Sequence, residues 1–383
     1  MLPQVQRQPW MSEEIDSFRQ EIRRVIAAEF SPRLDAWRRQ GFIPREAWQQ
    51  LGNLGALLPE IDEIYGGSGS SVGYQMVLQD ELARAEIPGL SAVHSIAAHY
   101  LLDYGTETQK RRWLPRLARG ELFAGIAMTE PGCGSDLKAI RTTARREGDQ
   151  YVINGTKIFI SNAFSGNLLI LVARTGESGS RGVSLVVLET ENLPGFAVGR
   201  RLEKIGQHAA DTSEVFLENV RVPVGNLLGC EEGRGFAQLM SQLPFERMLI
   251  AVCAAAAIER AVEVTVEYVK ERKAFAKALS EFQNTRFKLA ECATIAHVVR
   301  TFVNDCIQRL VDGTLDTEAA YMAKWWSAEQ QCRVTDECLQ LFGGYGYMQD
   351  YVIGRLFVDS RAQKIYGGTN EIMKDLIARK LFE

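Results

Sequence analysis

Hydrophobic and polar residues follow a helical period over the first third of the chain. Ser12 is placed to cap a helix that carries Glu13 and Glu14 in its first turn. One face of this predicted helix is apolar: Ile15, Phe18, Ile22, Val25 and Ile26. Helical spacing recurs over 74–86, 91–104 and 107–119. The first third is therefore predicted to be a block of helices.

The pattern changes between Phe123 and Val224, where short β-rich runs alternate with turn residues. The runs are Thr142 to Arg145, Tyr151 to Ile153, Leu168 to Ala173 and Val183 to Leu188. The pair Asn154-Gly155 lies between two such runs and predicts a tight hairpin turn. This middle third is predicted to be an antiparallel β domain of about 100 residues.

Helical spacing returns from about Glu232. Residues 245–272 are nearly all apolar, which predicts a long helix that is buried on most faces. Further helices are predicted over 284–312 and 317–341, ending at Gly343 and Gly344, and a last one begins at Thr369. The chain is therefore predicted to be an α+β protein with three domains: N-terminal helices over 1–122, a central β domain over 123–231, and a C-terminal helical bundle over 232–383.

Composition narrows the possible functions. The chain has 383 residues, of which 46% are hydrophobic, and a net charge of −4. That charge argues against broad binding of nucleic acid and against strong attraction to a membrane surface. The apolar run from Leu249 to Ile258 is too short to span a bilayer. The N-terminal decapeptide has no apolar core after a basic start, so we expect no signal peptide.

The cysteines and histidines point away from metal chemistry. The seven cysteines include no CxxC pair, and most of them fall in helical stretches, as buried apolar residues do. The four histidines form no ligand pattern. We therefore expect a reducing cytoplasm, no disulfides and no metal site.

Three segments combine glycines with hydroxyl, acid or amide side chains: Met128 to Asp136, Lys157 to Asn162, and Gln340 to Tyr347. Glycines let a backbone approach a ligand closely, and hydroxyls and exposed amides suit a phosphate or the edge of a heteroaromatic ring. Each segment also has a plain structural interpretation. The first could be a turn, the second a strand followed by a turn, and the third the end of a helix.

Together and in this order, the three segments are more specific. Along nearly its whole length the chain resembles the acyl-CoA dehydrogenase family. Thr129 to Asp136 resembles that family's T-E-P-x-x-G-S-D signature, and Gln340 begins a second one. Glu271 to Phe275, with Gln283 downstream, resembles a third family block. The resemblance implies an N-terminal helical domain, a central β domain and a C-terminal four-helix bundle.

The resemblance also implies FAD as cofactor, a homotetramer built as a dimer of dimers, acyl-CoA as substrate, and an electron-transfer flavoprotein as electron acceptor. Ile126, Met128 and Thr129 are expected along the flavin ring. Phe159 and Ser161 are expected on its other side; the family often has tryptophan at the Phe159 position.

Further residues are expected around FAD. Ser135 should lie near both the FAD pyrophosphate and the CoA moiety. Three residues are expected to reach the FAD of a neighbouring subunit: Arg272, Phe275 and Gln283. Three more are expected on the adenosine side of that FAD: Gln340, Gly343 and Gly344. Thr369 and Glu371 resemble family positions that touch FAD. Cys133 stands where alanine is common, and we interpret it as a small buried filler.

The catalytic base is not where most family members have it. That glutamate would stand at Gly367, which has no side chain. A minority, including the isovaleryl-CoA and long-chain enzymes, supplies the base from the long C-terminal helix, and Glu246 aligns with it. The substrate is expected to contact Ser135, Phe245, Arg247, Tyr366, Gly367 and Gly368. The Gly367 amide would donate to the thioester carbonyl. The alternative is that Glu246 only offsets the dipole at a helix N-terminus.

The expected reaction is α,β-dehydrogenation of a medium- to long-chain acyl-CoA, straight or methyl-branched, to the trans-2-enoyl-CoA in fatty-acid β-oxidation. Stretches 243–250, 268–275 and 365–374 look most like the long-chain enzymes, and Ala97 and Ala98 would leave room for a long chain. Isovaleryl-CoA or another short branched acyl-CoA is the alternative substrate. The alternative functions are an acyl-CoA oxidase or monooxygenase on the same scaffold, and a non-catalytic protein that binds acyl-CoA or flavin.

Overall fold

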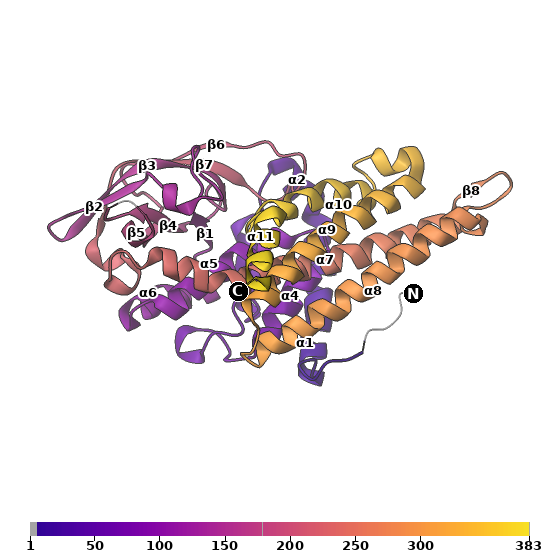
Figure 1. The fold of residues 1–383 in the computed structure, drawn as a ribbon, viewed down its shortest axis with the longest axis horizontal. Helices are drawn as coiled ribbons and strands as arrows, with labels where there is room; N and C mark the ends of the chain where they lie inside the picture. Colours follow the sequence, from indigo (N-terminus) through magenta and orange to yellow (C-terminus); the bar gives the residue numbers. More distant parts are fainter. Residues whose placement is uncertain (1–5, 178, 383) are drawn as a thin grey trace.

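The computed structural model describes residues 6–177 and 179–382 of the chain. Helices come first along the sequence, strands follow, and helices complete it. Figure 1 places the sheet at one end of the molecule, and the long C-terminal helices run from its centre to the other end. The first helices pack beneath the C-terminal ones, so both helical parts share one hydrophobic core.

The N-terminal helices form where their apolar faces predict them. They are α1 (Glu13–Val25), α2 (Leu34–Gln40), α3 (Arg45–Asn53), α4 (Val72–Arg84), α5 (Ala92–Tyr104) and α6 (Glu107–Ala118). The Ser12 hydroxyl accepts a hydrogen bond of 3.3 Å from the Ile15 amide, which confirms the predicted cap. A π-helical turn over Ile26–Phe30 follows α1, and the sequence pattern did not predict it.

A seven-stranded sheet forms the middle of the chain. Its strands are β1 (Ala124–Ala127), β2 (Thr143–Glu147), β3 (Gln150–Ser161), β4 (Leu168–Arg174), β5 (Val183–Glu189), β6 (Phe196–Arg201) and β7 (Thr212–Pro223). The β3–β7, β6–β7, β2–β3 and β4–β5 pairs are antiparallel, as predicted. However, β1 lies parallel to β4, and Thr143 of β2 pairs in parallel with Arg174. The pattern of hydrophobic residues carried no information about these two parallel pairings.

The hairpin predicted at Asn154-Gly155 is wrong. The β2–β3 hairpin turns six residues earlier, at Gly148 and Asp149, and the Asn-Gly pair lies inside β3. The pairing with β7 shifts register between Ile153 and Gly155. A Cβ on Gly155 would overlap the Thr142 side chain, so this glycine serves a close approach rather than a turn.

The C-terminal helices are α7 (Gly235–Glu271), α8 (Gln283–Val311), α9 (Thr317–Phe342), α10 (Val352–Ser360) and α11 (Asn370–Leu381). The predicted end of α9 at Gly343 is confirmed, and the Thr369 hydroxyl caps α11 by accepting from the Ile372 amide at 3.3 Å. The predicted start of the long helix at 245 is wrong, because α7 already begins at Gly235 and contains Pro244. Its first turn packs so closely on Ser184 that a Cβ on Gly235 would lie 2.7 Å from that backbone.

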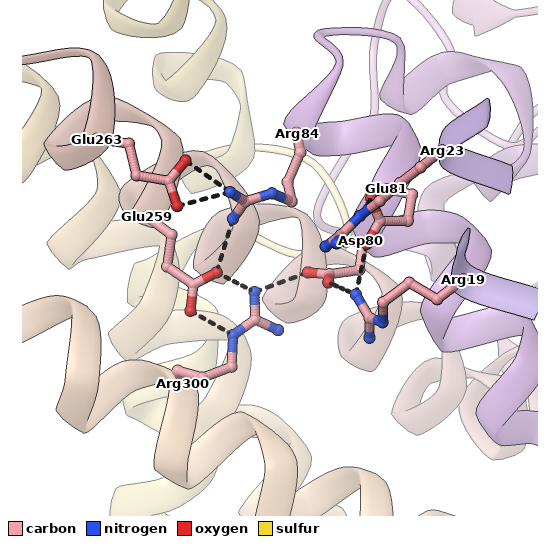
Figure 2. A network of polar contacts seen from close by, with 8 residues as sticks. All are labelled: Arg19, Arg23, Asp80, Glu81, Arg84, Glu259, Glu263 and Arg300. Carbon is pink, nitrogen blue, oxygen red and sulfur yellow. Dashed lines mark hydrogen bonds and ion pairs between the residues drawn. The ribbon is translucent and has the colours of Figure 1, made fainter. Parts of the chain in front are cut away.

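A network of ion pairs ties the N-terminal helices to the C-terminal ones. Figure 2 shows Arg300 of α8 between Asp80 of α4 and Glu259 of α7, each 2.7 Å away. Arg84 of α4 in turn reaches Glu259 and Glu263 of α7. Because Asp80 is buried, its charge depends on these partners. No helix among residues 6–177 and 179–382 is long and apolar enough to cross a membrane.

Candidate active site

Helix α7 places Glu246 far from any helix end. The helix begins at Gly235, so Glu246 lies about three turns inside it. The field of a helix N-terminus falls off within the first turn. The alternative interpretation, in which Glu246 offsets that field, is therefore wrong.

The Glu246 carboxyl group is turned into the protein, although the residue as a whole is half-buried. Its Oε2 atom is buried and has no hydrogen-bond partner within the described chain. Burial raises the pKa of Glu246, and the charges of Arg247 and Lys324 oppose that rise in part. The pKa of the Tyr100 hydroxyl is also raised, by burial first and then by the Glu246 charge. A carboxylate whose pKa moves towards neutral is suited to act as a general base.

Gly367 lies directly beside this carboxylate. Its φ is +64° and that of Gly368 is +87°, both in the left-handed region that glycine adopts without strain. A Cβ on Gly367 would lie 3.5 Å from Glu246 Oε1 and would overlap the Ile250 side chain. The missing side chain therefore leaves the space against which Glu246 and Ile250 pack.

Arg247 connects α7 to the same turn. Its Nε donates to the Gly367 carbonyl at 3.4 Å, and its guanidinium carbon lies 4.4 Å from the centroid of the Tyr321 ring. Its Nη1 is buried and unpaired among the described residues, so a donor remains available there. The structure thus brings together four residues that the sequence analysis assigned to the base and the substrate: Glu246, Arg247, Gly367 and Gly368.

Sequence reasoning missed Lys324, which belongs to the same cluster. This α9 side chain donates to the Gly368 carbonyl at 2.7 Å and to Asn370 Oδ1 at 3.1 Å. Its neighbours along one helix face are the small buried residues Ala320, Ala323 and Ser327. A single lysine in such a face was the available sign that a buried cation stands there.

On the sheet, the first two glycine-containing segments meet. The buried Lys157 ammonium donates to Glu130 Oε1 at 2.8 Å and to the Met128 carbonyl at 3.0 Å. The Ile158 amide donates to the Thr129 carbonyl at 2.9 Å. Glu130 also accepts from the Arg141 and Thr142 amides, so this motif glutamate has a structural role.

These contacts bring Ile126, Met128 and Thr129, all half-buried, to the strand that carries Phe159 and Ser161. A Cβ on Gly125 would overlap the Ser161 carbonyl, so β1 and the end of β3 approach closely. Ser135 lies exposed nearby in the sequence, while Cys133 is buried, as expected of a filler.

Phe159 has the features of a residue that packs against a bound ligand. It is 63% exposed, and its φ of +61° is unusual for a bulky residue. The register between β3 and β7 shifts between Lys157 and Ile160, so a bulge turns the ring outward. An exposed aromatic ring beside the half-buried hydroxyl groups of Thr129 and Ser161 fits a planar, polar-edged ring system such as a flavin.

The remaining predicted cofactor residues lie elsewhere. Arg272 and Phe275 stand at the tip between α7 and α8, which carries the small strands β8 (Lys273–Ala274) and β9 (Lys277–Ala278). Figure 1 shows this tip at the opposite end of the molecule from β1 and β3. Phe275 is 92% exposed, and the Arg272 guanidinium lies 5.6 Å from the Tyr345 ring. One chain therefore cannot bring this tip to Phe159.

The rest of that second group is also solvent-facing. Gln283, Gln340, Gly343 and Gly344 are exposed, and a Cβ on either glycine would meet no atom within 4 Å. Thr369 and exposed Glu371 begin α11, beside the Gly367 turn. The Tyr366 hydroxyl accepts from Gln207 Nε2 at 3.3 Å, which joins this turn to the loop between β6 and β7. Phe245, just before the base, stacks on His99 with ring centroids 4.0 Å apart.

Comparison with known proteins assigns this architecture. Family models match at residues 12–121 (acyl-CoA dehydrogenase, N-terminal domain), 125–220 (middle domain) and 233–382 (C-terminal domain). The chain belongs to the acyl-CoA dehydrogenase family. The mouse protein named long-chain specific acyl-CoA dehydrogenase, mitochondrial, is 44% identical over 375 residues, which cover 97% of this chain and 87% of the mouse protein.

Solved structures agree. The crystal structure of an acyl-CoA dehydrogenase from Geobacillus kaustophilus has a TM-score of 0.95 and 44% identity, covering 97% of this chain and 99% of that one. A glutaryl-CoA dehydrogenase from Mycobacterium smegmatis in complex with FADH2 has a TM-score of 0.90 and 27% identity, covering 97% and 95%. This acyl-CoA dehydrogenase is thus a flavin-dependent oxidoreductase acting on acyl-CoA, with FAD as its cofactor. Among residues 6–177 and 179–382, no three or more His, Cys, Asp or Glu side chains are grouped to hold a metal ion.

Proposed function

We propose that this acyl-CoA dehydrogenase converts a medium- to long-chain acyl-CoA, straight or methyl-branched, to the trans-2-enoyl-CoA, with Glu246 as the base that removes the α-proton. One observation carries the proposal: the Oε2 atom of half-buried Glu246 is itself buried and unpaired among the described residues, and its Oε1 atom faces the bare α-carbon of Gly367. A base at Gly367 itself is absent from this chain, and Glu246 occupies the neighbouring space.

The roles of the chain's residues follow from this arrangement. Glu246 takes the α-proton onto a carboxylate oxygen, which its raised pKa favours. The Gly367 amide donates to the thioester carbonyl and stabilises the negative charge that develops there as the proton leaves. Arg247 holds the Gly367 carbonyl and offers its free Nη1 to the substrate. FAD, when bound against Phe159, Ser161 and the Ile126–Thr129 segment, supplies the acceptor for the hydride that leaves the β-carbon.

The substrate class rests on similarity. The mouse relative is named for long-chain acyl-CoA. Stretches 243–250, 268–275 and 365–374 of this chain resemble the long-chain enzymes. Ala97 and Ala98 are fully buried on α5, beside Tyr100. A short branched acyl-CoA such as isovaleryl-CoA is the alternative substrate.

The assembly and partners belong to the proposal as well. Because the tip that carries β8 lies far from β3 in one chain, a neighbouring subunit would have to supply the tip to each FAD. We therefore infer an assembly of several copies of this chain and propose a homotetramer built as a dimer of dimers. Separately, we propose an electron-transfer flavoprotein as the electron acceptor. The cytoplasmic location, the role in fatty-acid β-oxidation and the domain boundaries at 122/123 and 231/232 stay predictions.

The decisive experiment replaces the base. A Glu246→Gln protein should retain FAD and bind acyl-CoA, but anaerobic flavin bleaching by acyl-CoA should slow about 10²–10⁴-fold, the usual contribution of a general base. Glu267→Gln is the matched control, because Glu267 is exposed on the same helix. Bleaching of the Glu246→Gln protein at the wild-type rate would show that the base is elsewhere.

The same assay distinguishes the alternatives. A panel of acyl-CoAs that differ in length and branching identifies the preferred substrate by the rate of bleaching. Steady formation of peroxide during turnover would indicate an oxidase or monooxygenase. A yellow protein that no acyl-CoA bleaches would indicate a non-catalytic acyl-CoA- or flavin-binding protein.

A further inference from the structure

Lys324 lies in this site, but the reaction proposed above assigns it no role. Its side chain is fully buried, at 0% exposure, in the middle of α9. A buried ammonium without a counter-ion is costly, so its surroundings should explain its presence. Within the described chain, no carboxylate lies within ion-pair distance of its Nζ.

Its hydrogen bonds go instead to the glycine turn. The Nζ donates to the Gly368 carbonyl at 2.7 Å and to Asn370 Oδ1 at 3.1 Å. The side-chain Nδ2 of Asn370 donates to Glu329 Oε2 at 3.0 Å, and Glu329 Oε1 pairs with the Lys364 ammonium at 2.8 Å. A polar chain thus runs from α9 to both sides of the turn.

Lys324 and Arg247 act on successive peptide groups. Arg247 holds the carbonyl of Gly367, and Lys324 holds the carbonyl of Gly368. Each peptide group is planar, so fixing its carbonyl fixes its plane. Two glycines in succession would otherwise be the most flexible part of the loop. These two bonds therefore restrain the turn that presents the Gly367 amide.

The second effect of Lys324 is electrostatic. The charged groups that act on Lys324 are Arg247 and Glu246 of α7 and Glu371 of α11. Tyr321 of α9 lies against Arg247, and Tyr100 of α5 interacts with Glu246. Burial and the Arg247 charge lower the pKa of Lys324 to about 8, and Glu246 and Glu371 oppose that shift. In turn the Lys324 charge lowers the pKa of Glu246.

We propose that Lys324 is a positioning residue for α-proton removal: it holds the Gly367-Gly368 turn through the Gly368 carbonyl, and its charge keeps the Glu246 carboxylate ionised. This role rests on the proposed function of Glu246. The competing interpretation is that Lys324 only cross-links α9 to α11 and has no influence on the base.

Two variants separate the parts of this role. Lys324→Met removes both the donor and the charge, whereas Lys324→Gln removes the charge and keeps a donor for Gly368. Without the cation, the carboxylate form of Glu246 is less favoured, so the pKa of Glu246 rises. Lys364→Met is the matched control, because it breaks the same polar chain at Glu329 without a contact to Gly368.

The measurement isolates proton removal from hydride transfer. An acyl-CoA analogue with sulfur in place of the β-carbon cannot transfer hydride, and loss of its α-proton is followed by the long-wavelength charge-transfer band of the enolate with oxidised flavin. The midpoint pH, at which the charge-transfer band reaches half its maximal intensity, should rise by about one unit in both Lys324 variants. At a pH well below the midpoint, this shift corresponds to an about tenfold weaker band than in wild type. Lys364→Met should keep the wild-type midpoint. Band formation in Lys324→Met should also weaken more than in Lys324→Gln.

The outcomes are distinguishable. If both Lys324 variants keep the wild-type midpoint, even with a lower melting temperature, Lys324 is only a structural cross-link and the inference is overturned. If Lys324→Met does not fold, the midpoint pH of Lys324→Gln alone decides between the positioning role and a structural cross-link. Glu246→Gln is measured in parallel: a band of wild-type strength in that protein would overturn the proposed base itself. Loss of its band, together with unmoved Lys324 midpoints, would overturn the role of Lys324 alone.

Discussion

Replacing Gly367 by alanine tests how closely the turn and the base are packed. The added methyl group would stand 3.5 Å from Glu246 Oε1 and would overlap Ile250 Cδ1. It would also force a residue with a Cβ to keep a φ of +64°. Gly313 offers a matched control, because its φ is +67° but a Cβ there meets no atom within 4 Å.

The expected cost can be worked out from these two positions. An L-residue in the left-handed region costs about 1–2 kcal/mol, which applies to both variants. Forcing Ile250 aside adds about 1–3 kcal/mol of overpacking in Gly367→Ala only. With about 2.1 cal/mol/K of unfolding entropy per residue, 383 residues correspond to about 0.8 kcal/mol/K. The melting temperature should therefore fall by about 1–2.5 °C in Gly313→Ala and by about 2.5–6 °C in Gly367→Ala.

The activity of the two variants should differ more than their stability. Ile250 lies one turn from Glu246, and a shifted turn misplaces the Gly367 amide. Loss of one well-placed donor to a developing oxyanion costs about 10²–10³ in rate, so bleaching by acyl-CoA should slow at least tenfold in Gly367→Ala. Gly313→Ala should bleach at the wild-type rate.

Thermal unfolding of the FAD-loaded proteins and anaerobic stopped-flow bleaching measure both effects. The reasoning is refuted if Gly367→Ala melts within a degree of Gly313→Ala and bleaches as fast as wild type. That result would mean that the loop relaxes freely and that its packing against Glu246 has no consequence.

Two further predictions concern buried charges. Arg300→Met removes the partner that Asp80 and Glu259 share, while Arg19 still pairs with Asp80 and Arg84 with Glu259, so stability should fall by about 1.5–3 kcal/mol. Exposed Arg309→Met should change stability by less than about 0.5 kcal/mol, and equal melting temperatures of the two variants would contradict this reasoning. Burial raises the pKa of Asp359 from 3.8 to about 6, so its contribution to stability is full below pH 3.8 and is lost as the pH rises through 6. Between pH 4 and pH 7, the free energy of unfolding of Asp359→Asn should therefore rise by up to about 3 kcal/mol relative to that of wild type. A difference in melting temperature that stays constant across this range would show that Asp359 does not titrate this way.

Much of the fold follows from local patterns. The apolar face from Ile15 to Ile26, the cap at Thr369 and the end of α9 at Gly343 were predicted, because helix periodicity and end residues are local properties. The hairpin predicted at Asn154-Gly155 was wrong because glycine suits both a tight turn and a place inside a strand where another segment approaches closely. The parallel pairing of β1 with β4 joins segments far apart in the chain, which no local pattern encodes.

The start of α7 was misplaced for a similar reason. Pro244 is a local helix breaker, yet α7 extends on both sides of it, and its first residue, Gly235, packs closely on the Ser184 backbone. This tertiary contact changed the interpretation of Glu246. A residue predicted to lie at a helix start lies inside the helix, where a dipole role is excluded and burial raises its pKa.

The sequence by itself determined the family, the cofactor and the two places, Glu246 and Gly367, that had to be considered together. It did so because motif residues keep their order and spacing along the chain. Only the tertiary structure decided that Glu246 faces the bare α-carbon of Gly367 and that Lys324 holds the next carbonyl. Lys324 and Gly368 are 44 residues apart, on α9 and just before α11. Distances across such separations, and the burial that shifts each pKa, exist only once the helices have packed.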